Sequence, residues 1–257
     1  MQFHGKTVAV TGGTNGIGLA VAQRLQVEGA RVLVLGRNTE KGQAALEVLG
    51  TEATFIACDV ADTDAVRVAF AEIGERFGDI DHAVNAAGVT APYGAVADLR
   101  VEDWEKVIRI NLHGPLYCLQ QELRMISKKV GGSIVNVSSC AGVMAMPFQA
   151  AYVASKAALN ALTQVVAMEN ACDRDGMHAV RVNAVAPGPI MGGMNSPERL
   201  AANPTGTKRK INATAMKRFG EADEVARAVL FLLGKEACFI TGSVLSVDGG
   251  YHIGKFE

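Results

Sequence analysis

The chain has 257 residues, of which 49% are hydrophobic, with 25 basic and 26 acidic side chains. This length and apolar content suffice for one large core, and a net charge of −1 excludes the strongly basic surface of a nucleic-acid-binding protein. No apolar run is long enough to cross a bilayer, and none follows a basic segment near residue 1, so we expect a cytoplasmic protein with no membrane partner.

Short runs rich in β-branched residues recur along the chain and predict buried parallel strands. In chain order they are Thr7–Val10, Arg31–Leu35, Thr54–Cys58, Ile80–Val84, Ser133–Val137, Val180–Val185 and Val244–Val247. The segments between them have helical spacing; the clearest runs from Val66 to Phe77, with Asp62 or Asp64 as its N-cap. This alternation predicts an α/β fold, a single doubly wound Rossmann domain over residues 1–257 with about seven parallel strands flanked by helices.

The segment from about residue 189 to 219 departs from this alternation. Prolines and glycines break any long regular element there; they include Pro189, Gly192, Gly193, Pro197, Pro204 and Gly206. A long irregular segment in a compact domain usually covers a binding site. We therefore predict a substrate lid, the alternative being a disordered surface insertion.

The cysteines and histidines show no metal-binding or disulfide pattern. No Cys-x-x-Cys pair occurs, which disfavours a disulfide framework or a zinc site. We therefore expect no metal ion and interpret all five cysteines as small buried hydrophobic residues. They are Cys58, Cys118, Cys140, Cys172 and Cys238.

A glycine-rich turn, Thr11-Gly12-Gly13-Thr14-Asn15-Gly16-Ile17-Gly18, directly follows the first predicted strand and leads into a predicted helix. Glycine lets backbone amides approach a phosphate, and a helix N-terminus adds unpaired N–H groups and a positive dipole. The spacing differs from Gly-x-Gly-x-x-Gly and from a Walker loop. Its position after a leading strand nevertheless predicts a binding site for a phosphate-containing cofactor.

Tyr152 and Lys156 are spaced i, i+4 at the start of a predicted helix, so their side chains project from one face. A free tyrosine has a pKa of about 10, and we expect the nearby ammonium group to lower that pKa until the phenol can act as a general acid–base. Ser139 follows the strand Ser133–Val137 at the carboxyl edge, where α/β sheets bind ligands, and Ser138 is its rival. The tyrosine–lysine pair alone is also compatible with an ordinary surface helix.

These motifs resemble those of the short-chain dehydrogenase/reductase family, whose single-domain members carry Thr-Gly-x-x-x-Gly-x-Gly at the first turn. Asn85-Ala86-Ala87-Gly88 matches the family's Asn-Asn-Ala-Gly with one substitution, and the serine-to-tyrosine spacing selects Ser139, leaving Ser138 a supporting position. The resemblance implies that the catalytic residues are Asn111, Ser139, Tyr152 and Lys156. It implies cofactor contacts from Gly12, Thr14, Asn15, Gly16, Ile17, Gly18, Arg37, Asp59, Val60, Asn85, Ala86, Gly88, Tyr152, Lys156, Pro187, Gly188 and Ile190.

The residues after the second predicted strand, Gly36-Arg37-Asn38, indicate which nicotinamide is bound. A carboxylate at this point accepts hydrogen bonds from the adenosine ribose and would repel a 2′-phosphate. Arg37 instead offers a planar array of donors suited to phosphate. We therefore predict NADP(H) as the preferred cofactor, with NAD(H) possible; the alternative is that Arg37 is only a solvated surface charge.

The resemblance implies an NAD(P)-dependent oxidoreductase of the EC 1.1.1 type that interconverts a ketone and a secondary alcohol. In the mechanism it implies, Tyr152 protonates the carbonyl oxygen that Ser139 binds, Lys156 holds the ribose and keeps Tyr152 acidic, and Asn111 anchors a proton-relaying water. It also implies a homo-oligomer, either a tetramer or a dimer. The alternative function is an NADP(H)-binding redox sensor without turnover.

Methionines near these motifs predict a mainly apolar small-molecule carbonyl or alcohol as the substrate, because methionine adapts to irregular apolar shapes. They are Met144, Met146, Met191, Met194 and Met216; the alternative is that they only pack beneath the lid. The basic cluster Lys208-Arg209-Lys210 could instead receive a carrier-bound substrate, as the resemblance to 3-oxoacyl-(acyl carrier protein) reductases implies. A solvated run of charges is the simpler interpretation of that cluster.

Overall fold

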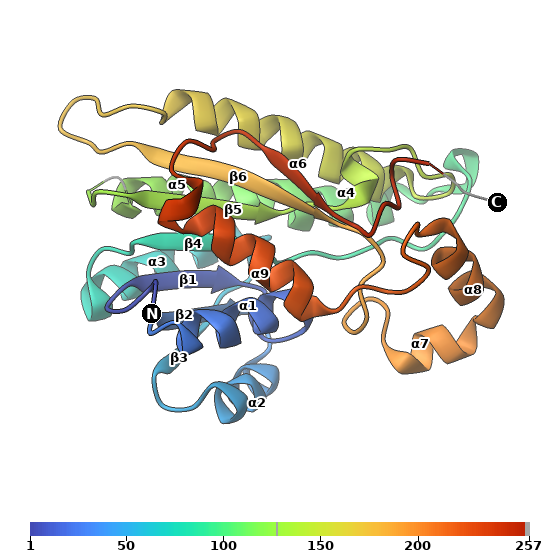
Figure 1. The fold of residues 1–257 in the computed structure, drawn as a ribbon, viewed down its shortest axis with the longest axis horizontal. Helices are drawn as coiled ribbons and strands as arrows, with labels where there is room; N and C mark the ends of the chain where they lie inside the picture. The colour runs from blue at the N-terminus through green and yellow to red at the C-terminus, as the bar shows by residue number, and fades with distance from the viewer. Residues whose placement is uncertain (127, 255–257) are drawn as a thin grey trace.

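A parallel sheet of seven strands runs through the middle of the computed structural model, which describes residues 1–126 and 128–254 (Figure 1). The strand order is β3-β2-β1-β4-β5-β6-β7. The strands are β1 (Thr7–Thr11), β2 (Arg31–Gly36), β3 (Ala53–Ala57), β4 (His82–Asn85), β5 (Gly132–Val137), β6 (Val180–Pro187) and β7 (Val244–Val247). The predicted doubly wound Rossmann sheet is confirmed, and its order reverses between β1 and β4, where such sheets bind ligands.

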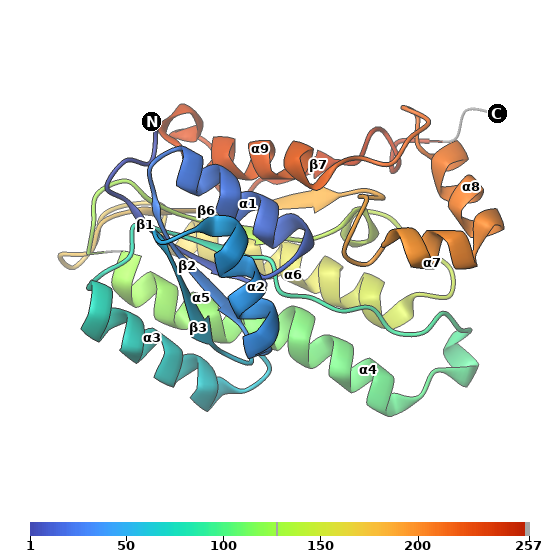
Figure 2. The same ribbon diagram turned by 90° about the horizontal axis from the view of Figure 1, so that it is seen from below.

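Helices cover both faces of the sheet (Figure 2). One face is covered by α1 (Gly16–Val27), α2 (Thr39–Leu49) and α9 (Ala222–Leu233); the other by α3 (Thr63–Phe77), α5 (Gly114–Ile126) and α6 (Ala150–Glu169). The helix α4 (Val101–Ile108) packs against α6 and continues into α5 through a π-helical turn, η2 (Arg109–His113). The described residues also form the short 3₁₀ turns η1 (Val96–Asp98), η3 (Cys140–Gly142) and η4 (Lys235–Ala237). No helix in the described residues combines the length and apolarity needed to span a membrane.

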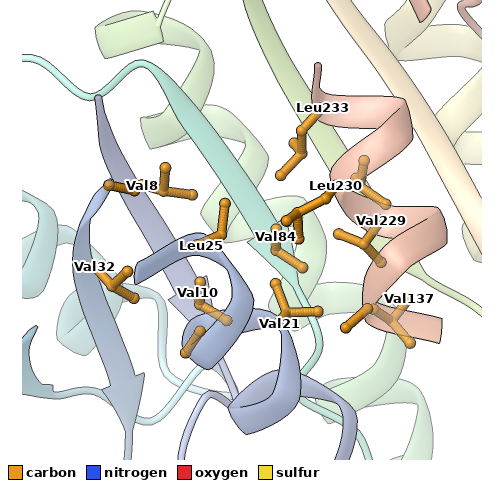
Figure 3. Packing of buried hydrophobic residues seen from close by; sticks show 14 of the residues in the cluster. Val8, Val10, Val21, Leu25, Val32, Val84, Val137, Val229, Leu230 and Leu233 are labelled. Carbon is orange, nitrogen blue, oxygen red and sulfur yellow. The ribbon is translucent and has the colours of Figure 1, made fainter. Parts of the chain in front are cut away.

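The core beneath α1 and α9 fixes the position of β1 (Figure 3). Val8 and Val10 of β1 are fully buried there, against Val21 of α1 and Val229 of α9. Burying each such side chain stabilises the fold by about 1.5–3 kcal/mol. Because β1 and α1 are held in this way, the turn between them has a defined place at the carboxyl edge of the sheet.

The segment between β6 and α9 contains two helices, of six and ten residues, where the sequence predicts only that no long regular element forms. They are α7 (Pro197–Ala202) and α8 (Pro204–Ala213), and each begins with a proline. A proline at the first helical position breaks no hydrogen bond, because that N–H has no partner inside the helix anyway. Ser196 and Asn203 act as the N-caps, accepting hydrogen bonds from the amides of Arg199 and Gly206.

The interpretation of the five cysteines as buried residues holds for three of them. Cys58, Cys118 and Cys140 are buried, whereas Cys172 and Cys238 are exposed. Cys172 follows the end of α6 and Cys238 follows η4. Both lie in surface connections, where the backbone is already solvated and a small side chain has no core to enter.

Candidate active site

The glycine-rich turn joins β1 to the first turn of α1 and requires glycine at two positions. Gly12 has φ of +66°, and a Cβ there would lie 2.7 Å from the backbone nitrogen of Ala87. A Cβ on Gly18 would lie 2.3 Å from the carbonyl oxygen of Gly12. The first turn of α1 carries no acidic residue. The unpaired amides and positive dipole of this helix end are therefore suited to a pyrophosphate. The turn from Gly12 to Gly18, the glycine cradle, fits a dinucleotide.

Most of the predicted cofactor residues line one cleft of about 800 Å³ at the carboxyl edge of the sheet. Those that line it are Gly12, Asn15, Gly16, Ile17, Gly18, Arg37, Ala86, Gly88, Tyr152, Lys156, Pro187, Gly188 and Ile190. Four others, Thr14, Asp59, Val60 and Asn85, do not belong to its lining.

The structure gives Asp59, Val60 and Asn85 supporting contacts instead. The carboxylate of Asp59 accepts a hydrogen bond from the amide of Ala61 at 3.0 Å. Val60 is buried against the start of α5, where a Cβ on Gly114 would come within 2.9 Å of it. The side-chain amide of Asn85 faces the interior of the protein, where it forms hydrogen bonds with Glu122 of α5 and Asn136 of β5.

Asn85 belongs to a buried polar network behind the cleft. Its Nδ2 donates to Glu122 Oε2 at 3.0 Å and to Asn136 Oδ1 at 3.1 Å. Asn136 in turn donates to the hydroxyl of Thr163 on α6 at 2.9 Å. The side chain of Asn85 is thus committed to joining β4, β5 and α5, while its neighbours Ala86 and Gly88 line the cleft.

Ser139, Tyr152 and Lys156 lie together in the cleft. Ser139 caps the short turn η3 after β5, where its Oγ accepts a hydrogen bond from the amide of Ala141 at 3.1 Å. Tyr152 and Lys156 project from adjacent turns of α6, with the lysine Nζ 6.0 Å from the centre of the phenol ring. The hydroxyl of Ser138 is buried and donates to the carbonyl of Lys156, which fits the supporting place predicted for it.

Asn111 lies next to this group in the π-helical turn between α4 and α5. Its side-chain amide donates to the carbonyl of Val89 at 2.9 Å and to Ser155 Oγ at 3.1 Å, and accepts from the amide of Val89 at 2.9 Å. A Cβ on Gly88 would lie within 3.6 Å of both Asn111 Oδ1 and Lys156 Nζ. Asn111 therefore clamps the loop after β4 against α6, but its own side chain does not line the cleft.

The ionisation of Tyr152 differs from the prediction. Burial raises the pKa of Tyr152 to about 12, and its hydrogen bond with Ser139 acts in the opposite direction. Burial lowers the pKa of Lys156 to about 8, and its ammonium donates to the carbonyl of Val137 at 2.8 Å. Because Nζ is directed at that carbonyl, the expected lowering of the phenol pKa by Lys156 is absent from this structure.

Several side chains that line the cleft were not predicted from the sequence. They are Lys41, Tyr93, Lys106, Gln149, Arg199 and Tyr251. Lys41 lies in the first turn of α2, four residues after Arg37, and that spacing could have indicated it. The others lie on loops and helices far apart in the chain, and no local motif marks them.

Together, the reversal of strand order, the glycine cradle and the cleft beside them define a dinucleotide-binding protein of the Rossmann class. A family model described as enoyl-(acyl carrier protein) reductase matches residues 12–252. The chain is 38% identical to a 3beta-hydroxysteroid dehydrogenase from Mediterraneibacter gnavus, covering 97% of this chain and 96% of that protein. It is 36% identical to a 2,5-dichloro-2,5-cyclohexadiene-1,4-diol dehydrogenase from Sphingobium indicum, covering 97% of this chain and 98% of that protein.

Among solved structures, the protein gox2181 superimposes with a TM-score of 0.91 at 31% identity, over 98% of both chains. These similarities extend over nearly the whole chain, so the chain belongs to the short-chain dehydrogenase/reductase family. It is an oxidoreductase that acts on CH–OH groups of small molecules and uses a nicotinamide cofactor.

Proposed function

We propose that this enzyme interconverts a ketone and a secondary alcohol with NADP(H), using Tyr152 as the general acid–base. One observation carries the proposal: Ser139, Tyr152 and Lys156 line the same cleft as the glycine cradle. Bound there, the nicotinamide would supply or accept the hydride. Residues Gly12 to Gly18 would hold its pyrophosphate, and Pro187 and Gly188 would lie against its ring.

The protein's own residues then handle the proton. Ser139 donates a hydrogen bond to the substrate oxygen, and Tyr152 delivers a proton to that oxygen or removes one. The amine of Lys156 lies beside the phenol, with Nζ 6.0 Å from the centre of the ring. When a ligand orients its ammonium toward the phenol, the positive charge favours the phenolate and opposes the effect of burial.

The lining of the cleft supports the finer parts of the proposal. Arg37 and Lys41 place two positive charges at the end of β2, where a 2′-phosphate would lie, and this supports a preference for NADP(H). Residues of the segment 189–219, including Met191, Met194 and Asn195, line the cleft and support its role as a lid. The homo-oligomeric state and a carrier-bound substrate remain predictions from the family resemblance.

The test is to incubate the pure protein with NADPH and a panel of ketones while following the absorbance of the reduced nicotinamide. Replacing Tyr152→Phe should reduce turnover by about 10²–10⁴-fold, because the proton donor is lost, while the Kd for NADPH from a fluorescence titration stays unchanged. Tyr117→Phe is the matched control, because Tyr117 of α5 does not line the cleft. Full activity in Tyr152→Phe would contradict the assignment; NADPH binding without turnover of any ketone would favour the redox-sensor alternative.

A further inference from the structure

All the charged side chains among the described lining residues of the cleft are positive. Its charged residues are Arg37, Lys41, Lys106, Lys156, Arg199 and Lys210, and none of the described lining residues is acidic. The whole chain carries 26 acidic and 25 basic side chains, so this is a local segregation and not a consequence of composition. A concave surface lined by one sign of charge concentrates ligands of the opposite sign.

The cofactor of the proposed function accounts for only part of this charge. Arg37 and Lys41 follow β2, at the adenosine end, and Lys156 lies beside Tyr152 at the nicotinamide end. Lys106, Arg199 and Lys210 come from α4 and the two lid helices. These three form no ion pair with any carboxylate in residues 1–126 and 128–254.

Lys210 is the best placed of these three to bind a ligand. Its Nζ donates to Asn195 Oδ1 at 2.7 Å, and Asn195 Nδ2 donates to the carbonyl of Ile190 at 2.8 Å. The ammonium is half-buried, and burial lowers its pKa. A partly desolvated ammonium without a counter-ion is unfavourable, so an anion beside it would relieve that cost.

The chain just beyond α8 contacts the segment that carries Tyr251 of the cleft lining. Met216, just beyond α8, donates its amide to the carbonyl of Gly249 at 3.1 Å, two residues before Tyr251 of the cleft lining. Tyr251, Tyr93 and Tyr152 all line the cleft, so the end of α8 borders the cleft that holds the proton donor.

We propose that the substrate is an amphipathic ketone or alcohol whose anionic group, a carboxylate or a phosphate, is bound by Lys210 with help from Arg199. This proposal rests on the proposed function and adds the chemical class of the substrate. The apolar body of the substrate would lie along Met146, Met191 and Met194, which also line the cleft. The prediction of a mainly apolar substrate is thereby refined to an apolar molecule with a charged end.

The test uses three probes with the same chain length: a medium-chain oxo-carboxylate, its uncharged methyl ester and the corresponding oxo-alkyl phosphate. With NADPH, the wild-type enzyme should have kcat/KM values about 10-fold to 100-fold higher for one or both anions than for the ester, as a charge-assisted hydrogen bond provides. The better anion identifies the natural headgroup. Lys210→Gln should remove this advantage through KM, with kcat and the values for the ester little changed.

Lys208→Gln is the matched control, because Lys208 lies on the same helix but is exposed and does not line the cleft. It should behave as wild type. Equal kcat/KM for the anions and the ester would overturn the proposal. The proposal would also be overturned if Lys210→Gln weakened NADPH binding but kept the preference for anions, because Lys210 would then bind the cofactor and not the substrate.

Calorimetric titration of the three probes into the NADPH-bound protein separates this proposal from the proposed function. Binding of an anion that Lys210→Gln weakens, without turnover of any probe, would contradict the proposed function and leave the anion site standing. Failure of both anions to bind more tightly than the ester would overturn the anion site, whatever the activity.

Discussion

Arg37 is the side chain on which the proposed preference for NADP(H) depends. It follows β2 directly, lines the cleft and is exposed, so its guanidinium is available to a ligand. The adjacent Gly36 has little room for a side chain, because a Cβ there would lie 3.0 Å from Thr14 Cγ2. An acidic residue at position 36 would therefore be crowded, and the charge at this corner of the cleft comes from Arg37 and Lys41.

Removing the charge of Arg37 should change the cofactor preference. We expect Arg37→Gln to lower kcat/KM for NADPH by about 10-fold to 100-fold, the loss of a bidentate charged contact, while the value for NADH changes little. Initial rates with each cofactor measure this directly. Arg67→Gln on the exposed face of α3 is the control and should leave both values unchanged. A wild-type enzyme that uses NADH as well as NADPH would contradict the predicted preference.

For single residues, the sequence predicts the members of contiguous motifs well, but it does not predict what surrounds each side chain in the fold. The glycine turn and the i, i+4 pair Tyr152 and Lys156 lie where local spacing predicts them. The pKa of Tyr152 could not be predicted, because it depends on burial by distant segments and on Val137, whose carbonyl holds the ammonium of Lys156. The partner of Asn85, Glu122, lies 37 residues further along the chain, and no motif connects them.

The helix ends show which elements local chemistry determines. Asp62, one of two predicted candidates, is the N-cap of α3, and its carboxylate accepts from the amides of Asp64 and Ala65. The sequence predicts that Pro197 and Pro204 interrupt regular structure, whereas in the structure they begin α7 and α8. A proline can stand at the first position of a helix or just beyond its end, and only the conformation of the next residues separates the two cases. The sequence of the segment 189–219 did not distinguish them.

Two glycines at α3 allow a matched test of helix energetics. Gly74 lies inside the helix on its exposed side, and a Cβ there meets nothing within 4 Å. We expect Gly74→Ala to raise the free energy of unfolding by about 0.5–1 kcal/mol, because alanine loses less backbone entropy in a helix. Urea denaturation measures this change.

Gly78 follows the end of α3 and should respond in the opposite direction. It also has open space around it, but its φ is 73° and its ψ is −153°, a region that is essentially restricted to glycine. Gly78→Ala should therefore lower the free energy of unfolding by about 1–3 kcal/mol. Equal effects of the two substitutions would show that backbone conformation does not govern this helix end.

At the scale of the whole molecule, one buried polar network joins elements that are distant in the chain. Glu122 of α5 accepts from Asn85 of β4, which also donates to Asn136 of β5, and Asn136 donates to Thr163 of α6. Glu122 Oε1 is buried and has no hydrogen-bond partner in the described residues. A buried carboxylate is costly unless it is fully paired, so the network favours the protonated acid.

This network should make stability depend on pH. Burial raises the pKa of Glu122 from its usual value of about 4.5 to about 8, and the hydrogen bond from Asn85 acts against that rise. Between these two values the folded protein keeps a proton that the unfolded chain has released. The free energy of unfolding should therefore fall as the pH rises through this window, by at most of order 1 kcal/mol per pH unit.

Replacing Glu122→Gln removes the titrating group while keeping the shape of the side chain. Urea denaturation at about pH 6 and pH 8 should show a smaller loss of stability at the higher pH for this variant than for the wild type. Other groups titrate equally in both proteins, so the difference between the two pH dependences belongs to Glu122. Glu75→Gln on the exposed side of α3 should reproduce the wild-type dependence. The same pH dependence in Glu122→Gln and wild type would mean that the folded protein already ionises this carboxyl near its ordinary pKa.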